Sequence, residues 1–243
     1  MRTIRCFVDL EFQVGNEIQL PELASNHLVR VLRLESGDAI HLFNGNGLEY
    51  HARLASIGKK YTTAHIDSVN QTQTESPLKI HLYQSIARGE KMDLILQKTT
   101  ELGVTAFTPM VSDRTEVKLD NERSEKKLHH WQGVIRSACE QSGRSVLPAL
   151  NSPIAIKQLT ANTRGGQAFY LDPKATHRIK TLQINGAEEI ILAIGPEGGF
   201  SDRDIELLQI AGFQGVCAGP RILRTETAGI AFIAALQSQY GDW

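Results

Sequence analysis

Two short segments near the end of the sequence concentrate glycine, acidic, basic and hydroxyl residues directly after apolar runs. The first is GPEGGFS at residues 195–201, and the second is GPRILRTETA at residues 219–228. Adjacent glycines let a backbone approach a ligand closely, while carboxylates and guanidinium groups can move protons or stabilise developing charge. These residue types in this order predict a small-molecule site that is capable of acid–base or electrostatic catalysis.

The first segment does not match the usual phosphate-binding loops. Neither the GKS or GKT of a P-loop nor GxGxxG after a strand is present. Ser201 followed by Asp204 is typical of a capping box at the start of a helix, and such a helix end could bind an anion. A plain strand-to-helix turn is the simpler interpretation, but it needs one glycine at most and does not explain Pro-Glu-Gly-Gly.

The second segment allows a structural and a functional interpretation. Arg224 and Glu226 could form a local salt bridge, and Thr225 or Thr227 could cap the helix that follows. That helix is apolar nearly all round over residues 228–236, which predicts burial, in part against a second subunit. Charges at the mouth of a buried helix cost desolvation free energy, so we favour a functional site.

The elements that must position these loops alternate between strand and helix. Strands are expected over 78–82, 104–111, 167–171, 190–194 and 215–218, and helices over 88–102 and 122–141. This order predicts an α/β domain with a mostly parallel sheet, and the handedness rules alone predict an unknotted, doubly wound one. Ligands of such sheets bind at the carboxyl ends of the strands, where both loops begin.

The first 70 residues have a different pattern. Three alternating runs at 39–45, 48–56 and 61–69 predict a small β-barrel. A short helix is expected over 23–34, capped by Ser25 or Asn26, with an apolar face of Leu28, Val31 and Leu32. Its basic stripe, His27, Arg30 and Arg33, is either a solvated face or a set of phosphate contacts. The segment 70–77 has no apolar residue and marks a linker, which predicts domains at 1–72 and 73–243.

Composition limits the possible partners and compartments. The formal net charge is -1, so bulk charge does not indicate nucleic-acid binding. Cys6, Cys139 and Cys217 have no metal-ligand spacing, and we expect no metal and a reducing compartment. No signal peptide and no membrane-length apolar run is evident, so we expect a cytoplasmic, soluble protein.

These motifs resemble those of the bacterial small-subunit ribosomal-RNA uridine-N3 methyltransferases of the SPOUT superfamily. The resemblance spans both halves of the chain in order. It is carried by NHLVRVLRL (26–34), RGEKMDLILQKTTELGV (88–104), ACEQSGR (138–144), IGPEGGFSDRDIE (194–206) and GPRILRTETA (219–228), and more loosely by LDPKA (171–175).

The resemblance implies a SPOUT-type fold, with a deep trefoil knot in the C-terminal domain and helices on both faces of its sheet, behind a PUA-like barrel that holds RNA. It implies a homodimer through the knotted domain. It also implies S-adenosyl-L-methionine as cofactor, bound by three knot loops. The implied cofactor residues are Leu171, Ile194, Gly195, Glu197, Gly198, Ala218, Gly219, Ile222, Leu223 and Thr225.

The implied reaction is methylation of N3 of one uridine in 16S ribosomal RNA, as free RNA or in the assembled small subunit. Uracil N3 must lose its proton to attack, so a glutamate could accept it and an arginine could stabilise the flanking oxygens. Arg224 and Glu226 are the candidates. Arg144 could complete the site, in its own subunit or across the dimer, or could be a cation at a helix C-terminus. The expected phosphate contacts are His27, Arg30, Arg33, Arg2, Arg5, Lys59 and Lys60.

Two other functions fit parts of the pattern. A ribose 2′-O-methyltransferase would use the same fold, but we would expect a serine- and asparagine-bearing third loop in place of LRTETA. A non-catalytic RNA-binding module would use the barrel and an inactive knot. The glycines and charged residues retained in both loops argue against such a module.

Overall fold

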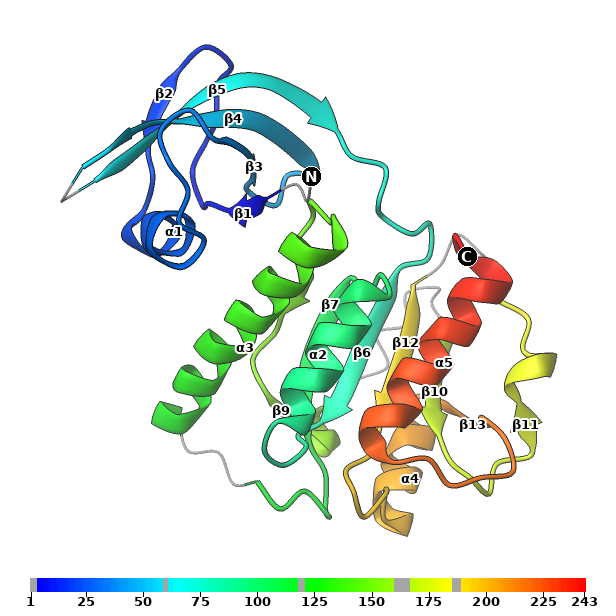
Figure 1. Cartoon of the computed structure of the whole chain (residues 1–243). Coiled ribbons are helices and arrows are strands. Elements are labelled where there is room, and N and C mark those ends of the chain that lie inside the picture. Colours follow the sequence, from blue (N-terminus) through cyan, green and yellow to red (C-terminus); the bar gives the residue numbers. More distant parts are fainter. Residues whose placement is uncertain (1–3, 59–60, 118–120, 160–166, 185–188) are drawn as a thin grey trace. The chain divides into compact units, whose positions relative to one another are not determined.

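A computed structural model describes residues 4–58, 61–117, 121–159, 167–184 and 189–243 (Figure 1). The chain divides into two compact units. The first contains residues 1–75 and 136–147, and the second contains residues 76–135 and 148–243. The segment 136–147 therefore belongs with the N-terminal unit, although it follows 60 residues of the other unit. The sequence pattern gave no indication of this arrangement.

The first unit is built on a five-stranded sheet in the order β1-β3-β4-β5-β2. The strands are β1 (Arg5–Phe7), β2 (Glu17–Gln19), β3 (Ala39–Phe43), β4 (Leu48–Ile57) and β5 (Thr62–Gln71). The three longest confirm the three alternating runs. Because alternate residues point to opposite faces, one face buries Ile40, Leu42 and Tyr50 in the core. The other face carries polar side chains such as His41 and Arg53, together with the buried Phe43.

The helical segment of this unit differs from its prediction. Helix α1 (Glu22–Ser25) begins after Pro21, and a π-helical turn, η1 (Asn26–Val31), continues it. The N-cap of α1 is Pro21, so neither Ser25 nor Asn26 caps the start of the helix as predicted. Leu28 is fully buried, but Val31 is 68% exposed. The predicted apolar face assumed 3.6 residues per turn. The π-turn has more residues per turn, as its hydrogen bond from Leu32 N to His27 O over five residues shows, so Val31 points to solvent.

The second unit is an α/β domain whose strands are all paired in parallel within the described residues. The sheet order is β11-β13-β10-β12-β6-β7-β8, with β9 also beside β7. This confirms the expected parallel sheet. The strands are β6 (Ile80–Ser85), β7 (Ala106–Val111), β8 (Ala149–Leu150), β9 (Ile154–Ala155), β10 (Gln167–Leu171), β11 (His177–Arg178), β12 (Ile190–Ile194) and β13 (Gln214–Cys217).

Helices cover both faces of this sheet. Ile191 and Ala193 of β12 pack with Leu208 of α4 (Asp202–Ile210), while Ile194 lies against Gly229 of α5 (Thr225–Tyr240). Helix α5 packs beside α2 (Lys91–Glu101). The predicted helix at 122–141 is α3 (Asn121–Ser142), and η2 (Ile156–Gln158) and η3 (Ile179–Thr181) are short 3₁₀ turns. Within the described ranges, no helix has both the length and the apolar character to cross a membrane.

Candidate active site

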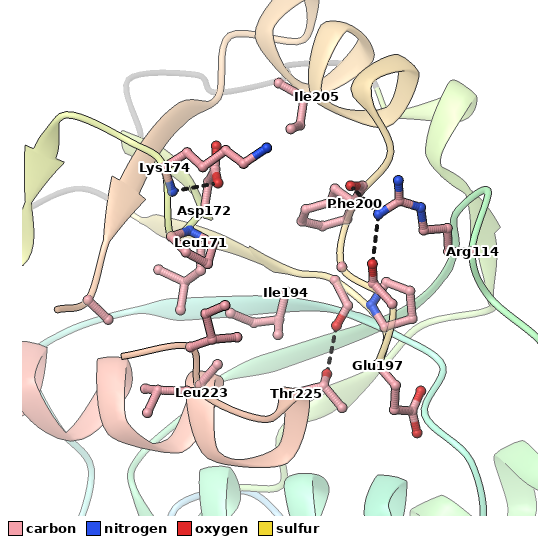
Figure 2. Close-up of a pocket in the computed structure, with 18 of the residues that line it drawn as sticks. Arg114, Leu171, Asp172, Lys174, Ile194, Glu197, Phe200, Ile205, Leu223 and Thr225 are labelled. Carbon is pink, nitrogen blue, oxygen red and sulfur yellow. Dashed lines mark hydrogen bonds between the residues drawn. The ribbon is translucent and has the colours of Figure 1, made fainter. Parts of the chain in front are cut away.

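The two predicted loops lie together, joined by a third. Strands β13, β10 and β12 are neighbours in the sheet and parallel, so their carboxyl ends meet at one edge. We call the segments after them loop 1 (172–174, after β10), loop 2 (195–200, after β12) and loop 3 (218–224, after β13). They enclose a cavity of about 410 Å³ (Figure 2). This volume lies in the range of small-molecule sites.

All ten residues that were expected to bind the cofactor line this cavity. Leu171, Ile194 and Leu223 supply apolar surface, and Figure 2 shows them below the opening between loops 1 and 2. Charged side chains of the lining come from loops 1, 2 and 3 and from the start of α4. The remaining expected residues are Gly195, Glu197, Gly198, Ala218, Gly219, Ile222 and Thr225.

Loop 2 folds back on itself. Gly199 has φ +68° and donates its N–H to Pro196 O at 2.9 Å, and glycine adopts this left-handed conformation at little cost. A Cβ on Gly195 would lie 3.1 Å from Phe200 N and 3.2 Å from Gly199 C. Loop 2 therefore needs glycine at 195 for close approach and at 199 for its dihedral angle.

The predicted capping box after loop 2 is confirmed. Ser201 Oγ accepts from Asp204 N at 3.0 Å, and Asp204 Oδ2 accepts from Ser201 N at 2.9 Å. The fully buried Asp204 also accepts the N–H of Asp113, and Ser201 donates its hydroxyl proton to Asp113. These bonds attach the loop after β7 to the start of α4.

The sequence did not predict a role for Arg114, which lies in the loop after β7 that these bonds hold against α4. Its guanidinium donates to Gly198 O at 2.8 Å and Phe200 O at 3.3 Å, and it lines the cavity (Figure 2). It lies after β7, far from loops 1–3 in sequence, and no motif marks it. An arginine that follows a parallel strand is the only sequence signal that could have found it.

Loop 3 ends at a helix that is not capped by a threonine. Arg224 is the N-cap of α5, without a side-chain cap, so the prediction of a Thr225 or Thr227 cap is wrong. Thr225 is buried, and its hydroxyl donates to Gly195 O of loop 2 at 2.6 Å. Arg221 and Arg224 are exposed. The expected desolvation cost therefore does not apply to the two arginines.

Charged groups of α2 and α5 meet beside loop 2. Lys91 Nζ lies 3.0 Å from Glu197 Oε1 and 4.0 Å from Glu226 Oε2. Partial burial alone would raise the pKa of Glu197, but N–H groups of Glu197 and Arg88 and the Lys91 ammonium lower it. Glu226 Oε2 is buried and has no hydrogen-bond partner among the described residues. Neither Arg224 nor Glu226 lines the cavity, although Thr225 between them does.

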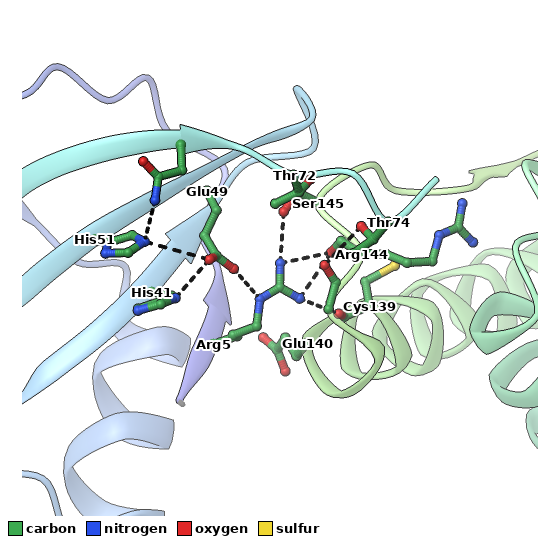
Figure 3. A network of polar contacts seen from close by, with 12 residues as sticks. Arg5, His41, Glu49, His51, Thr72, Thr74, Cys139, Glu140, Arg144 and Ser145 are labelled. Atoms are coloured by element: carbon green, nitrogen blue, oxygen red, sulfur yellow. Dashed lines mark hydrogen bonds and ion pairs between the residues drawn. The ribbon is translucent and has the colours of Figure 1, made fainter. Parts of the chain in front are cut away.

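Arg144 and Arg5 lie in a buried polar network of the first unit (Figure 3). The Arg144 side chain is 3% exposed, and its guanidinium donates to both oxygens of Glu75. Arg5 donates to Glu49 Oε2 at 2.6 Å, to Cys139 O at 2.7 Å and to Ser145 Oγ at 2.8 Å. These contacts join β1 to the end of α3. Arg144 does not line the cavity.

The predicted phosphate contacts fall into three groups. His27, Arg30 and Arg33 are exposed on the first unit, on and after η1. Arg33 has φ +58°, a left-handed conformation that costs a side-chain-bearing residue roughly 1–2 kcal/mol. The Arg5 guanidinium makes its hydrogen bonds within the buried network described above. Arg2, Lys59 and Lys60 lie outside the described residues.

One group of side chains has metal-ligand types. His41, Glu49 and His51 place ligand atoms within 4.8 Å of one another, the only such group found in the described part of the chain. The two imidazole rings are stacked, with centroids 4.1 Å apart and planes 19° apart. Lone pairs lie in the ring planes, so they cannot converge on one ion in this arrangement. Arg5 also already neutralises Glu49.

Comparisons with known proteins give the family. A model described as an RNA methyltransferase domain matches residues 74–237, and one described as an RNA methyltransferase PUA domain matches residues 21–67. The ribosomal RNA small subunit methyltransferase E of Buchnera aphidicola from Schizaphis graminum is 34% identical, over 99% of this chain and 98% of its own. The chain belongs to this RNA methyltransferase family.

Solved members of the family share the whole fold. A methyltransferase from Legionella pneumophila, in complex with the bound cofactor SAM, is 40% identical with a TM-score of 0.96. The ribosomal RNA small subunit methyltransferase E from Neisseria gonorrhoeae, bound to S-adenosyl methionine, is 37% identical with a TM-score of 0.93. Both comparisons cover 100% of each chain. The mixed α/β fold with a PUA-like first domain is therefore confirmed.

Proposed function

We propose that this protein is an S-adenosylmethionine-dependent methyltransferase that methylates N3 of a specific uridine in 16S ribosomal RNA. The observation that carries the proposal is the three-loop cavity, in a chain that matches cofactor-bound methyltransferases over its full length. The relatives named ribosomal RNA small subunit methyltransferase E support the RNA substrate. The LRTETA sequence at residues 223–228, which covers the end of loop 3 and the start of α5, supports the base, rather than the ribose, as the methyl acceptor.

The cavity fits the cofactor by its chemistry. An adenosine moiety needs backbone hydrogen bonds for its base edge and apolar cover for its ring, which glycine-rich loops with Ile194 and Leu223 can supply. Without side chains at Gly195 and Gly198, loop 2 folds closely on itself and against Arg114 beside the cavity. When bound, S-adenosylmethionine supplies an electrophilic methyl group on a sulfonium. The rest of the catalysis is positioning and electrostatics from this chain.

Arg224 and Glu226 are the proposed catalytic residues. Arg224 is exposed and lies between the lining residues Leu223 and Thr225, and we assign its guanidinium to the charge that develops on an oxygen beside uracil N3. Glu226 is the proposed proton acceptor. Its carboxylate lies 4.0 Å from the Lys91 ammonium, and its Oε2 has no hydrogen-bond partner among the described residues, so this oxygen is available to accept a proton. We do not extend the proposal to Arg144, because Glu75 already holds its guanidinium.

RNA would bind through His27, Arg30 and Arg33 of the first unit. These side chains are exposed on η1 and in the turn directly after it, which suits contacts with neighbouring phosphates. The substrate would be the small-subunit RNA, free or assembled.

A trefoil knot is proposed for the second unit. Strand β13 lies between β10 and β11, although it follows both in sequence. The connection from β10 to β12 includes β11 and so passes to the far side of β13, and the chain then continues from β13 into α5 beside α2. This path supports threading of loop 3 through the β10–β12 connection. We also propose a homodimer through this unit and a cytoplasmic location.

The test is to incubate the protein with methyl-labelled cofactor and small ribosomal subunits, and then to digest the RNA to nucleosides. Label in 3-methyluridine is the expected result. Label in a 2′-O-methyl nucleoside would favour the ribose enzyme, and no label together with no binding of cofactor would favour an RNA-binding module. The same assay with protein-free RNA tells which substrate state is used.

A further inference from the structure

A buried glutamine lies behind the cavity and does not line it. Gln84 is near the end of β6, in register with Ile194 of β12, and is 1% exposed. Burying a primary amide costs free energy unless its polar atoms are bonded. The contacts of this amide therefore indicate why the position is not apolar.

The Gln84 amide bonds the first residue of α5, directly after loop 3, and through it is connected to loop 2. Its Nε2 donates to Ser85 O at 2.9 Å and to Thr225 Oγ1 at 3.1 Å. Thr225 Oγ1 in turn donates to Gly195 O at 2.6 Å. A threonine hydroxyl has one proton, so the donation to Gly195 requires the hydroxyl to accept from Gln84. We call Gln84, Thr225 and Gly195 the loop latch.

The carbonyl oxygen of the Gln84 amide indicates that glutamine at position 84 is not the most stabilising choice. Gln84 Oε1 is buried and has no hydrogen-bond partner in the described part of the chain. Both groups that Nε2 reaches act as acceptors, so a flipped amide would lose both bonds. A Cβ on Gly229 of α5 would lie 3.9 Å from Oε1, which leaves little space for a further group. The unpaired carbonyl is a cost that an apolar side chain would avoid.

We propose that Gln84 is a positioning residue for the cofactor. Its amide holds the Thr225 hydroxyl on the Gly195 carbonyl, which fixes the spacing of loop 2 and loop 3 across the cavity. The proposal rests on the proposed function, because S-adenosylmethionine is the ligand whose fit depends on that spacing. Gln84 itself does not touch the ligand, so its effect passes through Thr225.

The test compares variants that break the latch with variants that keep it. Gln84→Leu removes the amide donor, and Thr225→Val removes the hydroxyl at nearly constant shape. Each should raise the dissociation constant of S-adenosylmethionine about tenfold, the size expected for one buried hydrogen bond. Thr225→Ser keeps the hydroxyl and should restore affinity to within about threefold of wild type.

A matched control separates positioning from stability. Gln237 is also 1% exposed in the same unit, and its amide bonds Leu102 O at 2.7 Å and Ser76 Oγ at 2.6 Å. Gln237→Leu should lower the thermal midpoint without changing the affinity for S-adenosylmethionine. Gln84→Leu should change the affinity and raise KM for the cofactor while leaving KM for RNA unchanged.

The double variant Gln84→Leu/Thr225→Val gives the sharpest reading. If the two residues act through one latch, its loss of affinity should be smaller than the product of the two single losses. Independent effects would multiply and would overturn the proposal, as would wild-type affinity in Gln84→Leu or an equal loss of affinity in Gln237→Leu. If Gln84→Leu does not fold, Thr225→Val against Thr225→Ser decides alone, and equal affinities overturn the proposal.

Failure of the proposed function would look different. If the protein does not use S-adenosylmethionine, calorimetry of the wild-type protein shows no binding, and the positioning role of Gln84 falls with it. If only the methyl acceptor is wrong, binding persists and the nucleoside assay shows a product other than 3-methyluridine. Wild-type binding and methylation together with an unaffected Gln84→Leu variant would remove only the latch.

Discussion

Gly195→Ala should weaken cofactor binding more than Gly198→Ala does. The added methyl group would lie 3.1 Å from Phe200 N, 3.2 Å from Gly199 C and 3.4 Å from Gly199 Cα. All three neighbours are backbone atoms of loop 2, so no side chain can rotate away. The loop must move, and the bond from Thr225 to Gly195 O moves with it.

The magnitude follows from the cost of forcing a methyl group into a packed site. Overpacking of this kind costs about 1–3 kcal/mol, which corresponds to about 5- to 150-fold in a dissociation constant. At Gly198 the nearest atoms are Cδ and Cβ of Arg114, at 3.3 and 3.4 Å. That side chain is exposed and can shift, so Gly198→Ala should cost only about twofold.

The assay is isothermal titration of each variant with S-adenosylmethionine, together with a thermal midpoint to confirm folding. Gly198→Trp extends the series, because Arg114 alone cannot make room for an indole, and it should abolish binding while the fold persists. An equal or larger loss for Gly198→Ala than for Gly195→Ala would refute the reasoning. So would unchanged binding in Gly195→Ala.

Four further outcomes are expected. Arg224→Ala should bind cofactor normally and lose turnover in the nucleoside assay, and normal methylation would remove Arg224 from catalysis. Burial alone would raise the pKa of Glu49, but Arg5 and His41 lower it. The ionised Glu49 therefore stabilises the fold above pH 4.5, and this stabilisation is lost as the pH falls further. Glu49→Gln should lower the free energy of unfolding by about 3 kcal/mol at neutral pH, and denaturant titrations of this variant should show a weaker dependence of stability on pH. Arg30→Ala/Arg33→Ala should weaken RNA binding and reduce its salt dependence, with no change in cofactor affinity. Burial raises the pKa of Cys6 to about 12, so that thiol should resist alkylation at pH 8 until the protein unfolds, and rapid labelling of the native protein would contradict its burial.

The strand-to-loop pattern predicted two of the three loops, because parallel strands bring their carboxyl ends together at one edge of a sheet. Loop 1 and the ten expected cofactor residues, all of which line the cavity, came from the family resemblance and not from spacing. The order of the strands was not predictable from spacing, because β13 inserts between two earlier strands.

Residues that act from a distance in sequence were missed. Gln84 and Arg114 come from the ends of β6 and β7, where neither spacing nor residue type marks a site. Their roles depend on contacts with loops 2 and 3, which exist only in the fold. Val31 was placed on the wrong face because a π-turn cannot be read from a 3.6-residue period.

Reverse transcription of 16S ribosomal RNA tests the central claim most directly. A methyl group on uridine N3 blocks the Watson–Crick edge, so reverse transcriptase stops next to the modified base. RNA from cells that lack the gene should be read through, and the wild-type gene, but not one that encodes Gly198→Trp, should restore a single stop at a uridine. Read-through with the wild-type gene, or a stop that Gly198→Trp restores equally, would contradict a uridine-N3 methyltransferase that works through this cavity.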